Sequence, residues 1–596
     1  MNIENIKSLF DKIENIKSLF GKNNIYFKVP LYQRAYSWQE EQLAQFVEDL
    51  SESKRCGYHL GHFLFEPMLR ENGEMDDMGK VVYVIDGQQR LTTCVIFFSA
   101  LVSVLKNRKA EWKHDEEIIN KYIIEIENRY LRNEVNREPK FQTVEYDNNL
   151  FSDIIVNCGV DVWKDSFTSK SQGLIYGALC YFKKVLDKFS VNEICLLGRS
   201  LENACITTCF ADNKLQAVQI FSYQNDRGRN LTNLEVLKAY FMLLMYQAGS
   251  SDNDVRYVER SFEDIYHNIA EMTVEEDSVL NYYWKSVGEK GYGSEKTVPE
   301  VKVWVRNIPI DKRTEKIREF AKKLSRAFDV VKKVERDDSF DVKNLKNLNN
   351  MSYAYPMIIR ARLVNVKDDT FLRLIKLLEN ITFRTLLRGG RADIGSRLQT
   401  VFNEAIDDDG FNKMIDNIKN KVKGDWWWRF WNDDEVFGRL RGGWFYGNKV
   451  DNYLLWRYEQ HLCVDNYPVP RLCFGDVINN ESIEHIAPQT ENNLVESGYG
   501  IYEDENNKIN GIVSGEWMNC VGNLVLMAKA QNSSLGNKPF SHKVQVFGSD
   551  NLLNQQKEII KFVKDKNNPV WDRECIEKRR DIIVQAAEEI WNLNNI

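Results

Sequence analysis

The hydrophobic pattern of the first twenty residues contains a repeat. Two nearly identical decapeptides, IENIKSLFDK and IENIKSLFGK, place apolar side chains three to four residues apart at Ile3, Ile6, Phe10, Ile13, Ile16 and Phe20. This spacing predicts an amphipathic helix. A ten-residue period turns the apolar face by about 80° per repeat at 3.6 residues per turn. We therefore expect the helix to pack on its own domain, or on a partner subunit as the alternative, rather than to form a long coiled coil.

Two later segments combine an extended apolar run with a turn and a helix. From Lys80, the segment KVVYVIDGQQRLTTCVIFFSALVSVLK predicts a strand, an Asp-Gly turn and an apolar helix of several turns. The segment IFSYQNDRGRNLTNLEVLKAYF has a turn at residues 225–228. Thr232, followed three residues later by Glu235, predicts a capping box that begins the next helix.

The rest of the chain divides into a helical stretch and a C-terminal part rich in aromatic residues. Residues 250–420 alternate charged and apolar positions at helical spacing, with few Gly or Pro and no recognisable motif. The C-terminal part opens on four tryptophans, Trp426, Trp427, Trp428 and Trp431, and ends in a predicted helix over Pro569–Trp591. We expect the tryptophans to form an interdomain core. Stacking on a flipped or modified base is the alternative.

Length and composition indicate a soluble protein of two or three domains. A chain of 596 residues exceeds one ordinary hydrophobic core, and 43% hydrophobic with 28% charged residues is typical of globular proteins. No run of about eighteen apolar residues is present, and the N-terminus does not resemble a signal peptide. The 11 cysteines form no CxxC pair, and Cys205 and Cys209, one helical turn apart, are expected in buried packing. We expect a cytoplasmic location and no membrane partner.

The acidic charge limits how this chain could bind nucleic acid. A net charge of -7 and a pI near 5.8 argue against a protein that coats nucleic acid non-specifically, since such proteins neutralise many phosphates. Contact with DNA would have to be local. An acidic metal site with a limited basic patch, as in an enzyme, meets that condition.

A set of polar residues in the C-terminal part has the chemistry of phosphodiester hydrolysis. The segment ESIEHIAPQ predicts a strand that ends in Glu484 and His485, and CVGNLVLMAKAQNSS adds a second short strand with Asn523 and Asn532. Hydrolysis needs a base for water, a cation for the phosphate, and a group that orients the base. His485, Glu484 with Asn532, and Asn523 could fill these roles in that order. The alternative is that His485 only caps a strand end.

These segments resemble a known nuclease motif. IEHIAP, GNLVL and the later Asn532 are similar to the HNH motif, a two-stranded ribbon and a helix that hold one divalent metal ion (a ββα-metal domain). The resemblance implies that His485 is the general base, that Asn523 orients it, and that Glu484 and Asn532 bind the metal. The third motif position is Asn rather than His, a substitution also found in functioning HNH sites. Oxygen ligands favour Mg²⁺ or Mn²⁺.

A second set of polar residues lies at the predicted strand–turn–helix junction. Asp86, Gln88, Gln89 and Arg90 stand where a helix would begin, and free N–H groups at a helix N-terminus attract anions. Arg90 would offer a bidentate donor to a phosphate, and Asp86 a carboxylate for a cation or water. A strand–Gly–helix turn with an arginine is nevertheless more often structural.

The order of these motifs resembles one family of enzymes. VPLYQRAYSW, YHLGHFLFEP, VIDGQQRLTT and IFSYQNDRGRNLTNLEVLK are similar to the DGQQR domain, a relative of the ParB and sulfiredoxin nucleotide-binding fold. With an HNH domain behind it, the chain resembles GmrSD-type type IV restriction endonucleases, including single-chain BrxU-like enzymes and SspE-like phosphorothioate-sensing effectors. That family couples nucleoside triphosphate binding and hydrolysis to cleavage of modified phage DNA. The implied nucleotide-binding residues are Asp86, Gln88, Gln89, Arg90, Gln33 and Arg34, with Asn225, Asp226 and Arg227 as weaker candidates.

Several other polar residues receive a structural interpretation first. His59 and His62 have a spacing that suits a metal site but no third ligand nearby, so core or surface positions are favoured. His542 is expected at the surface or behind the site. Arg573, Arg579 and Arg580 on the last helix are candidate contacts for DNA phosphates, although a solvated basic face is the favoured alternative.

Together these features predict a mostly helical α+β protein with three domains. They are a nucleotide-binding α/β domain (1–245), a helical middle region (246–420) and a ββα-metal nuclease domain embedded in helices (421–596). The predicted function is a nucleotide-regulated, metal-dependent DNA endonuclease for phage defence, with DNA and a nucleoside triphosphate as partners and a homodimer as an open option. The alternative is a ParB-like DNA-binding switch without cleavage, against which the intact His485 and both asparagines argue. A nuclease directed at RNA also stays open.

Overall fold

The structure of the chain is a computed structural model. It describes residues 12–22, 25–30, 32–52, 58–67, 81–112, 115–156, 167–211, 216–217, 220, 232–288, 291–294, 296–389, 393–463, 472–489, 497–499, 517–547, 553–565 and 567–596. The chain forms two compact units: unit 1 contains Met1–Asn281 and Lys296–Glu335, and unit 2 contains Tyr282–Glu295 and Arg336–Ile596. Helices of the predicted middle region belong to both units. The division into three domains stays a prediction.

Unit 1 combines one mixed sheet with many helices. Its strands are β1 (Lys12–Asn15), β2 (Tyr26–Lys28), β3 (His59–Pro67), β4 (Val81–Asp86), β5 (Phe141–Gln142) and β6 (Cys205–Phe210). Its helices are α2 (Ile16–Phe20), α3 (Glu40–Glu52), α4 (Gln88–Asn107), α5 (Glu116–Ile126), α6 (Glu145–Phe151), α7 (Lys170–Leu186), α8 (Val191–Glu202), α10 (Asn233–Gln247), α11 (Asp252–Ala270), α12 (Glu276–Val287), α13 (Thr297–Asn307) and α14 (Ile310–Arg336). The first and last residues of α12 and α14 lie in different units.

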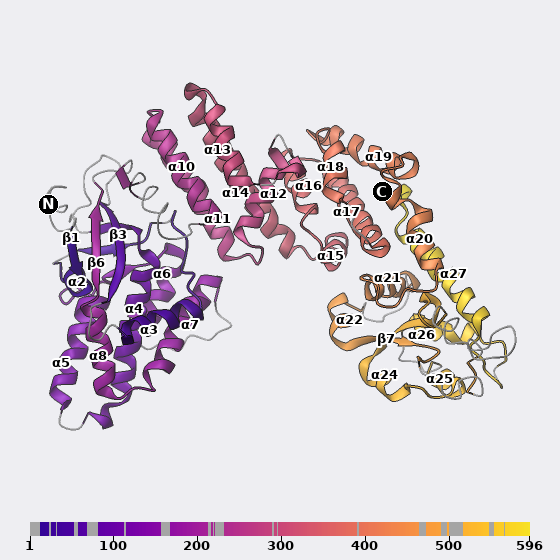
Figure 1. Cartoon of the computed structure of the whole chain (residues 1–596), viewed down its shortest axis with the longest axis horizontal. Helices are drawn as coiled ribbons and strands as arrows, with labels where there is room; N and C mark the ends of the chain where they lie inside the picture. Colours follow the sequence, from indigo (N-terminus) through magenta and orange to yellow (C-terminus); the bar gives the residue numbers. More distant parts are fainter. Residues whose placement is uncertain are drawn as a thin grey trace. The chain divides into compact units, whose positions relative to one another are not determined.

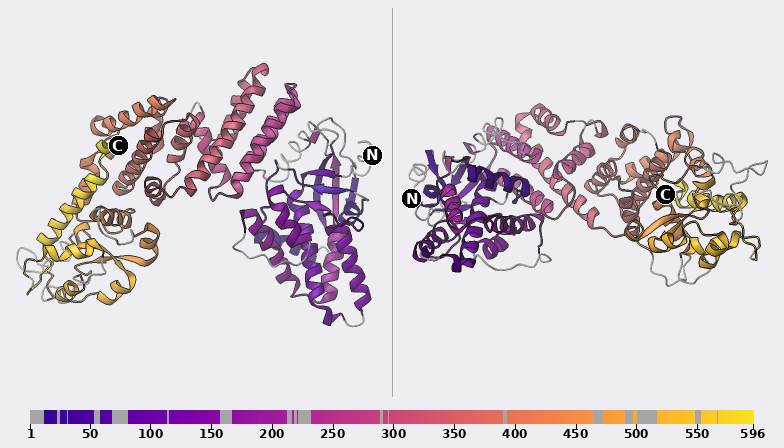
Figure 2. Two further views of the ribbon diagram at one scale, coloured as in Figure 1. Left: turned by 180° about the vertical axis from the view of Figure 1, so that it is seen from behind. Right: turned by 60° about the horizontal axis from the view of Figure 1, so that its bottom comes forward.

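The sheet of unit 1 has the order β1-β6-β3-β4-β2-β5. β3 pairs with β6 in parallel and with β4 in antiparallel orientation, while β2 is parallel to both β4 and β5. The helices α3, α4, α5, α7 and α8 gather on one side of this sheet (Figures 1 and 2). Their apolar side chains and those of the strands form one large core. The sheet and helices confirm the predicted mostly helical α+β class.

Helix α4 is the central helix of this core. Most of its residues are buried, which explains why its sequence is apolar on all sides. Within the described residues it is the one helix long and apolar enough to cross a membrane, and 89% of that window is buried inside the protein. A helix covered in this way is a core helix. The predicted strand–turn–helix is confirmed, with Gly87 at φ 88° between β4 and α4.

Two sequence-based expectations for unit 1 were wrong. The second copy of the N-terminal repeat is not a continuous helix, because β1 pairs with β6 and Asn15 begins α2 by accepting from the Ser18 amide at 2.8 Å. Ile13 is accordingly 72% exposed. Residues 3–11 of the first copy lie outside the described residues. Cys205 and Cys209 stand on strand β6 rather than one turn of helix apart, since sheet pairing outweighs local spacing.

The capping box that begins α10 is confirmed. The Thr232 side chain accepts from the Glu235 amide, and the Glu235 carboxylate accepts from the Thr232 amide at 2.9 Å. These two bonds satisfy N–H groups that a helix start otherwise leaves unpaired. The turn predicted at 225–228 lies outside the described residues.

Where the structure describes unit 2, it is helical apart from one two-stranded ribbon. Its strands are β7 (Glu481–His485) and β8 (Leu524–Ala528). Its helices are α15 (Phe340–Asn347), α16 (Ala354–Leu363), α17 (Asp368–Arg388), α18 (Ile394–Phe402), α19 (Asp408–Gly424), α20 (Asp433–Arg441), α21 (Asp451–Leu462), α22 (Phe474–Asn480), α24 (Lys529–Leu535), α25 (Phe540–Phe547), α26 (Asn554–Lys557) and α27 (Arg573–Ile590). The predicted C-terminal helix is confirmed, although it begins at Arg573 rather than Pro569.

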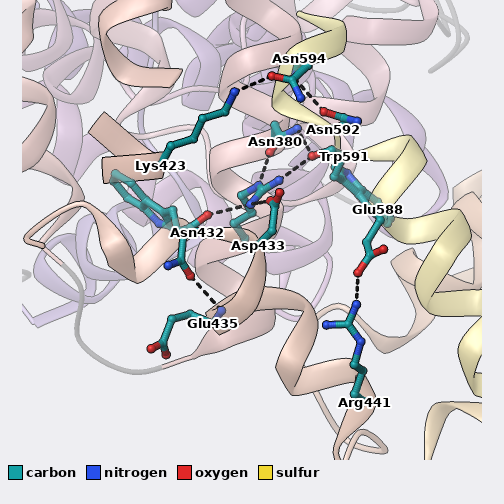
Figure 3. A network of polar contacts seen from close by, with 12 residues as sticks. Asn380, Lys423, Asn432, Asp433, Glu435, Arg441, Glu588, Trp591, Asn592 and Asn594 are labelled. Carbon is teal, nitrogen blue, oxygen red and sulfur yellow. Dashed lines mark hydrogen bonds and ion pairs between the residues drawn. The ribbon is translucent and has the colours of Figure 1, made fainter. Parts of the chain in front are cut away.

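A buried arginine ties α27 to the helices before the ribbon. Arg384 is fully buried and donates to the carbonyl oxygens of Trp431 and Trp591, both at 2.7 Å, and to Asp433 at 2.7 Å. Figure 3 shows the Trp591 carbonyl beside Asn380, which donates to it at 2.7 Å. This network fixes the C-terminal helix that packs on the ribbon.

The tryptophan cluster divides between core and surface. Trp428 and Trp431 have no exposed area, as expected for core residues. Trp426, by contrast, is 85% exposed. Trp427 is half-buried. A core position is therefore confirmed for Trp428 and Trp431 and not for Trp426, while the interdomain character of that core stays a prediction.

Candidate active site

The ribbon β7–β8 and helix α24 form a compact ββα arrangement. The two strands are antiparallel, with Glu484 opposite Val525 and His485 opposite Leu524. Helix α24 follows β8 directly and contacts both strands. Successive side chains of a strand point to opposite faces. Glu484 and Ser482 thus share one face of β7, and His485 lies on the other.

Glu484 is held in a buried ion pair with Lys543 of α25. The Lys543 ammonium lies 2.6 Å from Glu484 Oε1 and also donates to the carbonyl oxygens of His485 and Ile486, each at 3.1 Å. The lysine side chain has no exposed area and the glutamate side chain has 9%. Burial raises the pKa of Glu484 while Lys543 opposes that shift, and burial lowers the pKa of Lys543. Lys543 thus fixes both the carboxylate and the end of β7.

His485 lies on the other face of the ribbon, against a loop that precedes α21. Its ring meets the Tyr446 ring edge-to-face at a centroid distance of 4.5 Å. The Asn519 side chain hydrogen-bonds the imidazole, and Gln489 lies 3.2 Å from its Nε2. Burial lowers the pKa of His485 to about 4. The ring is therefore neutral at physiological pH and can accept a proton.

Asn523 holds the backbone that follows His485 rather than the ring itself. Its Oδ1 accepts from the Ala487 amide at 2.8 Å and from the Trp571 indole at 3.0 Å. Its Nδ2 donates to the carbonyl oxygens of Ala487 at 3.1 Å and Met518 at 2.9 Å. The side chain is completely buried. Asn523 thus fixes the chain two residues after His485, while the contact with the ring comes from Asn519.

Asn532 lies on the same face of the ribbon as Glu484. It stands in α24, is half-buried, and donates from Nδ2 to Ser482 Oγ at 2.8 Å. Ser482 is two residues before Glu484, so both side chains leave β7 on one face. An amide oxygen and a carboxylate are thereby brought to one side of the ribbon. Across the described ranges, no group of three or more His, Cys, Asp or Glu side chains could hold a metal ion.

The arginines of α27 differ in their access to solvent. Arg579 is fully buried, donates to the carbonyl oxygens of Gly522 at 2.9 Å and Leu524 at 2.6 Å, and pairs with Glu558 at 2.9 Å. It therefore supports the ribbon, and its selection as a DNA contact was wrong. Arg580 is 19% exposed and pairs with Asp581, and Arg573 is half-buried. His542 is exposed beside the buried Lys543, as expected.

The predicted nucleotide-binding residues are gathered at the β4–α4 junction. Arg90 donates to the carbonyl oxygens of Leu60 and His62, each at 2.8 Å, and lies 3.5 Å from Asp86. Gln88 is buried in the first turn of α4. These side chains connect α4 to the sheet strands β3 and β4.

Gln89 and Gln33 anchor the loop between β2 and α3 to this junction. Gln89 accepts from the Ser37 amide at 2.9 Å and donates to the Ala35 carbonyl at 3.0 Å. Gln33 donates to the Ile85 carbonyl at 3.2 Å, and Arg34 donates to the Ser37 hydroxyl. The structure therefore brings all six predicted residues together through β4, α4 and this loop. Asn225, Asp226 and Arg227 lie outside the described residues.

His59 and His62 are both exposed on β3, with ring centroids 6.0 Å apart. Both lie within the described residues, and they join no metal-binding cluster there. The surface interpretation is therefore the one that fits.

Sequence reasoning missed Gln489, four residues after His485, and three residues from more distant segments. Lys543, Asn519 and Tyr446 contact Glu484 or His485, yet each comes from a separate segment. Asn519, four residues before Asn523, offered a weak signal as a second amide near GNLVL. Lys543 and Tyr446 offered none, because only the fold brings α25 and the loop before α21 to β7.

Comparison with known protein families gives two matches. Residues 16–242 match the N-terminal domain of GmrSD restriction endonucleases. Residues 433–586, which include the whole ribbon, match the C-terminal domain of the same enzymes. No curated protein matches the chain.

Proposed function

We propose that this chain, which belongs to the GmrSD restriction endonucleases and joins their N-terminal and C-terminal domains, cuts DNA at an HNH-type site with His485 as general base. The family makes it a DNA endonuclease of restriction. The HNH chemistry, a divalent metal, control by a nucleoside triphosphate and selection of modified foreign DNA are our proposals. We also propose that it acts in the cytoplasm.

The surroundings of His485 carry the proposal. A general base must be unprotonated at the working pH and held in one orientation. Burial keeps the imidazole neutral, and Asn519 with the Tyr446 ring restrains it. The proton of an attacking water would pass to a ring nitrogen of His485. Asn523 hydrogen-bonds the backbone of Ala487, two residues after His485. Removing the Asn523 side chain would therefore displace His485, although Asn523 does not contact the imidazole ring.

Glu484, which directly precedes His485 at the end of β7, and Asn532 of α24 fit a hard divalent ion. Mg²⁺ and Mn²⁺ prefer oxygen ligands, and protein sites often supply only one or two of them beside phosphates and waters. Glu484 can offer a carboxylate oxygen and Asn532 its amide oxygen from one face of the ribbon. A bound divalent ion would neutralise charge on the scissile phosphate and the leaving oxygen. The Lys543 ammonium holds Glu484 in place.

The β4–α4 junction supports control by a nucleotide. One turn brings together four polar residues, Asp86, Gln88, Gln89 and Arg90. Gln89 also hydrogen-bonds the loop that contains Arg34. We propose that the protein has two conformations, one that cuts DNA and one that does not. A ligand that binds this part of unit 1 could favour one conformation only by binding it more tightly than the other. The nucleotide would thereby regulate cleavage at a site more than 390 residues away in the sequence.

The test compares cleavage by wild-type and His485→Ala protein. Purified protein is incubated with unmodified and modified plasmid DNA and Mg²⁺, with and without nucleoside triphosphate. We expect metal-dependent nicking by the wild type and none by His485→Ala, with unchanged thermal unfolding. Equal cleavage by a folded His485→Ala protein would remove the proposed base. A wild type that binds DNA without cutting any substrate would favour the switch that only binds.

A further inference from the structure

Unit 1 contains a cavity of about 650 Å³ bordered by the loop that Gln89 holds. Its walls are the loop at 34–39, the start of α7, the N-cap of α10, and residues 266–277 of α11 and α12. This volume is in the range of small-molecule sites. The first turn of α4 is not part of the lining. Its Gln89 instead supports the wall from behind, through Ala35 and Ser37.

One side chain of this wall has a buried polar atom without a partner among the described residues. Tyr266 is 2% exposed and lines the cavity, and its hydroxyl makes no hydrogen bond with the part of the chain that the structure describes. Buried hydroxyls are usually hydrogen-bonded, because an unsatisfied one costs roughly 1–3 kcal/mol. A ligand in the cavity would supply the missing partner.

The charges around the cavity have two signs. Arg34 and Lys170 contribute positive charge, and Lys170 is the first residue of the 17-residue helix α7, whose N-terminal end favours anions. Glu275, Glu276 and Asp277 contribute negative charge. Glu276 also hydrogen-bonds the Thr232 side chain. A fitting ligand therefore combines an anionic group with hydrogen-bond donors, as a nucleotide does with its phosphates, ribose hydroxyls and base.

We infer that the nucleotide binds in this cavity, with phosphates at Arg34 and Lys170 and its sugar or base at Tyr266 and Glu276. The inference rests on the proposed nucleotide control and names the residues of that site. The Asp86–Arg90 turn then acts through Gln89, as the support of the wall. Glu276 and Asp277 begin α12, the helix that continues into unit 2 at Tyr282. A nucleotide that binds at the first turn of α12 therefore contacts the segment that connects the two units along the chain.

The decisive variant is Tyr266→Phe in the full-length protein. Binding of ATP and GTP is measured by calorimetry, with inorganic triphosphate as a third probe that lacks sugar and base. Losing one neutral hydrogen bond should weaken ATP or GTP by about 3- to 10-fold and leave inorganic triphosphate unchanged. The melting temperature without nucleotide should not fall, because the hydroxyl has no partner to lose within the described residues. Lys170→Gln should weaken all probes that bind.

Tyr246→Phe is the matched control. The Tyr246 hydroxyl is another buried group without a partner among the described residues, but Tyr246 does not line the cavity. Its removal should leave nucleotide binding unchanged. Normal binding by both Tyr266→Phe and Lys170→Gln would overturn the assignment while the proposed function stands. Wild-type protein that binds no nucleotide would overturn both the assignment and the nucleotide control.

Discussion

Lys543 donates to Glu484 across 2.6 Å inside unit 2, so a buried ammonium accompanies the carboxylate proposed to bind metal. Because the same ammonium also donates to two carbonyl oxygens at the end of β7, it holds the strand that places His485. The ion pair is thus both a support for the ribbon and a restraint on Glu484.

Lys543→Met should abolish cleavage and destabilise unit 2. Removing one partner of a buried ion pair leaves an uncompensated charge and typically costs about 3–5 kcal/mol. The double variant Lys543→Met/Glu484→Gln should recover much of the thermal stability, since no buried charge remains, and should still not cut. Thermal unfolding and plasmid nicking measure the two effects. Full cleavage by the double variant would show that Glu484 does not bind the metal.

His485 should not titrate in the usual range of histidine. Its pKa of about 4 lies below the ordinary value of 6.5, so the folded state binds fewer protons than the unfolded state between these values. Stability from this group is therefore complete above about pH 6.5 and is lost as the pH falls toward 4. NMR of protein with labelled histidine, with His485→Gln for assignment, should show one ring that stays neutral at pH 5.5. A His485 ring that titrates near pH 6.5 would contradict the burial described for it.

Local patterns in the sequence were enough to predict the ribbon, α4 and the capping box. The short segments ESIEH and LVLMA and the turn residues around Gly87 carry enough local signal for these elements. The N-terminal repeat shows the limit of this reasoning. Its apolar spacing suits a helix, but β1 takes its partner from β6, nearly 200 residues later. Lys543 was unpredictable for the same reason, since its role depends on how α25 packs on β7.

Gly522 of the GNLVL segment illustrates a packing requirement. A Cβ at this position would lie 2.1 Å from the Ile576 carbonyl oxygen of α27, closer than atoms can approach. Gly522→Ala should therefore destabilise unit 2 by about 1–3 kcal/mol, as overpacking does. Gly438→Ala on α20 is the control, because a Cβ there meets nothing within 4 Å. Equal melting temperatures for the two variants would contradict the close approach of α27.

Trp444 is predicted to stack on DNA beside the candidate base. It is 63% exposed and stands two residues before Tyr446, whose ring contacts His485. The loop is anchored, because the Phe445 and Tyr446 amides both donate to the Asn519 carbonyl, at 2.9 and 3.1 Å. Stacking of a base on an aromatic side chain contributes about 1–3 kcal/mol.

Trp444→Ala should therefore lower the affinity for DNA by about 5- to 100-fold without changing metal dependence. Trp426→Ala, which removes a tryptophan that is 85% exposed, should have a smaller effect. Fluorescence anisotropy with a labelled duplex and a labelled single strand compares them. Equal affinities for wild type and Trp444→Ala would exclude the stacking contact.

Asn523, which directly precedes β8, and Asn532, which follows it in α24, should fail in different ways when changed. Asn523 is completely buried and makes four side-chain hydrogen bonds, so Asn523→Ala leaves the Ala487 and Met518 groups and the Trp571 indole without partners. We expect a lower melting temperature and no rescue of cleavage by excess Mn²⁺, because a displaced base is not restored by metal.

Asn532 is half-buried and makes one side-chain hydrogen bond, to Ser482. Asn532→Ala should keep the melting temperature within a few degrees and regain cleavage as Mn²⁺ is raised, since mass action offsets a lost ligand. Metal titrations of both variants at one DNA concentration decide the matter, and rescue of Asn523→Ala but not of Asn532→Ala would mean that the two roles are reversed.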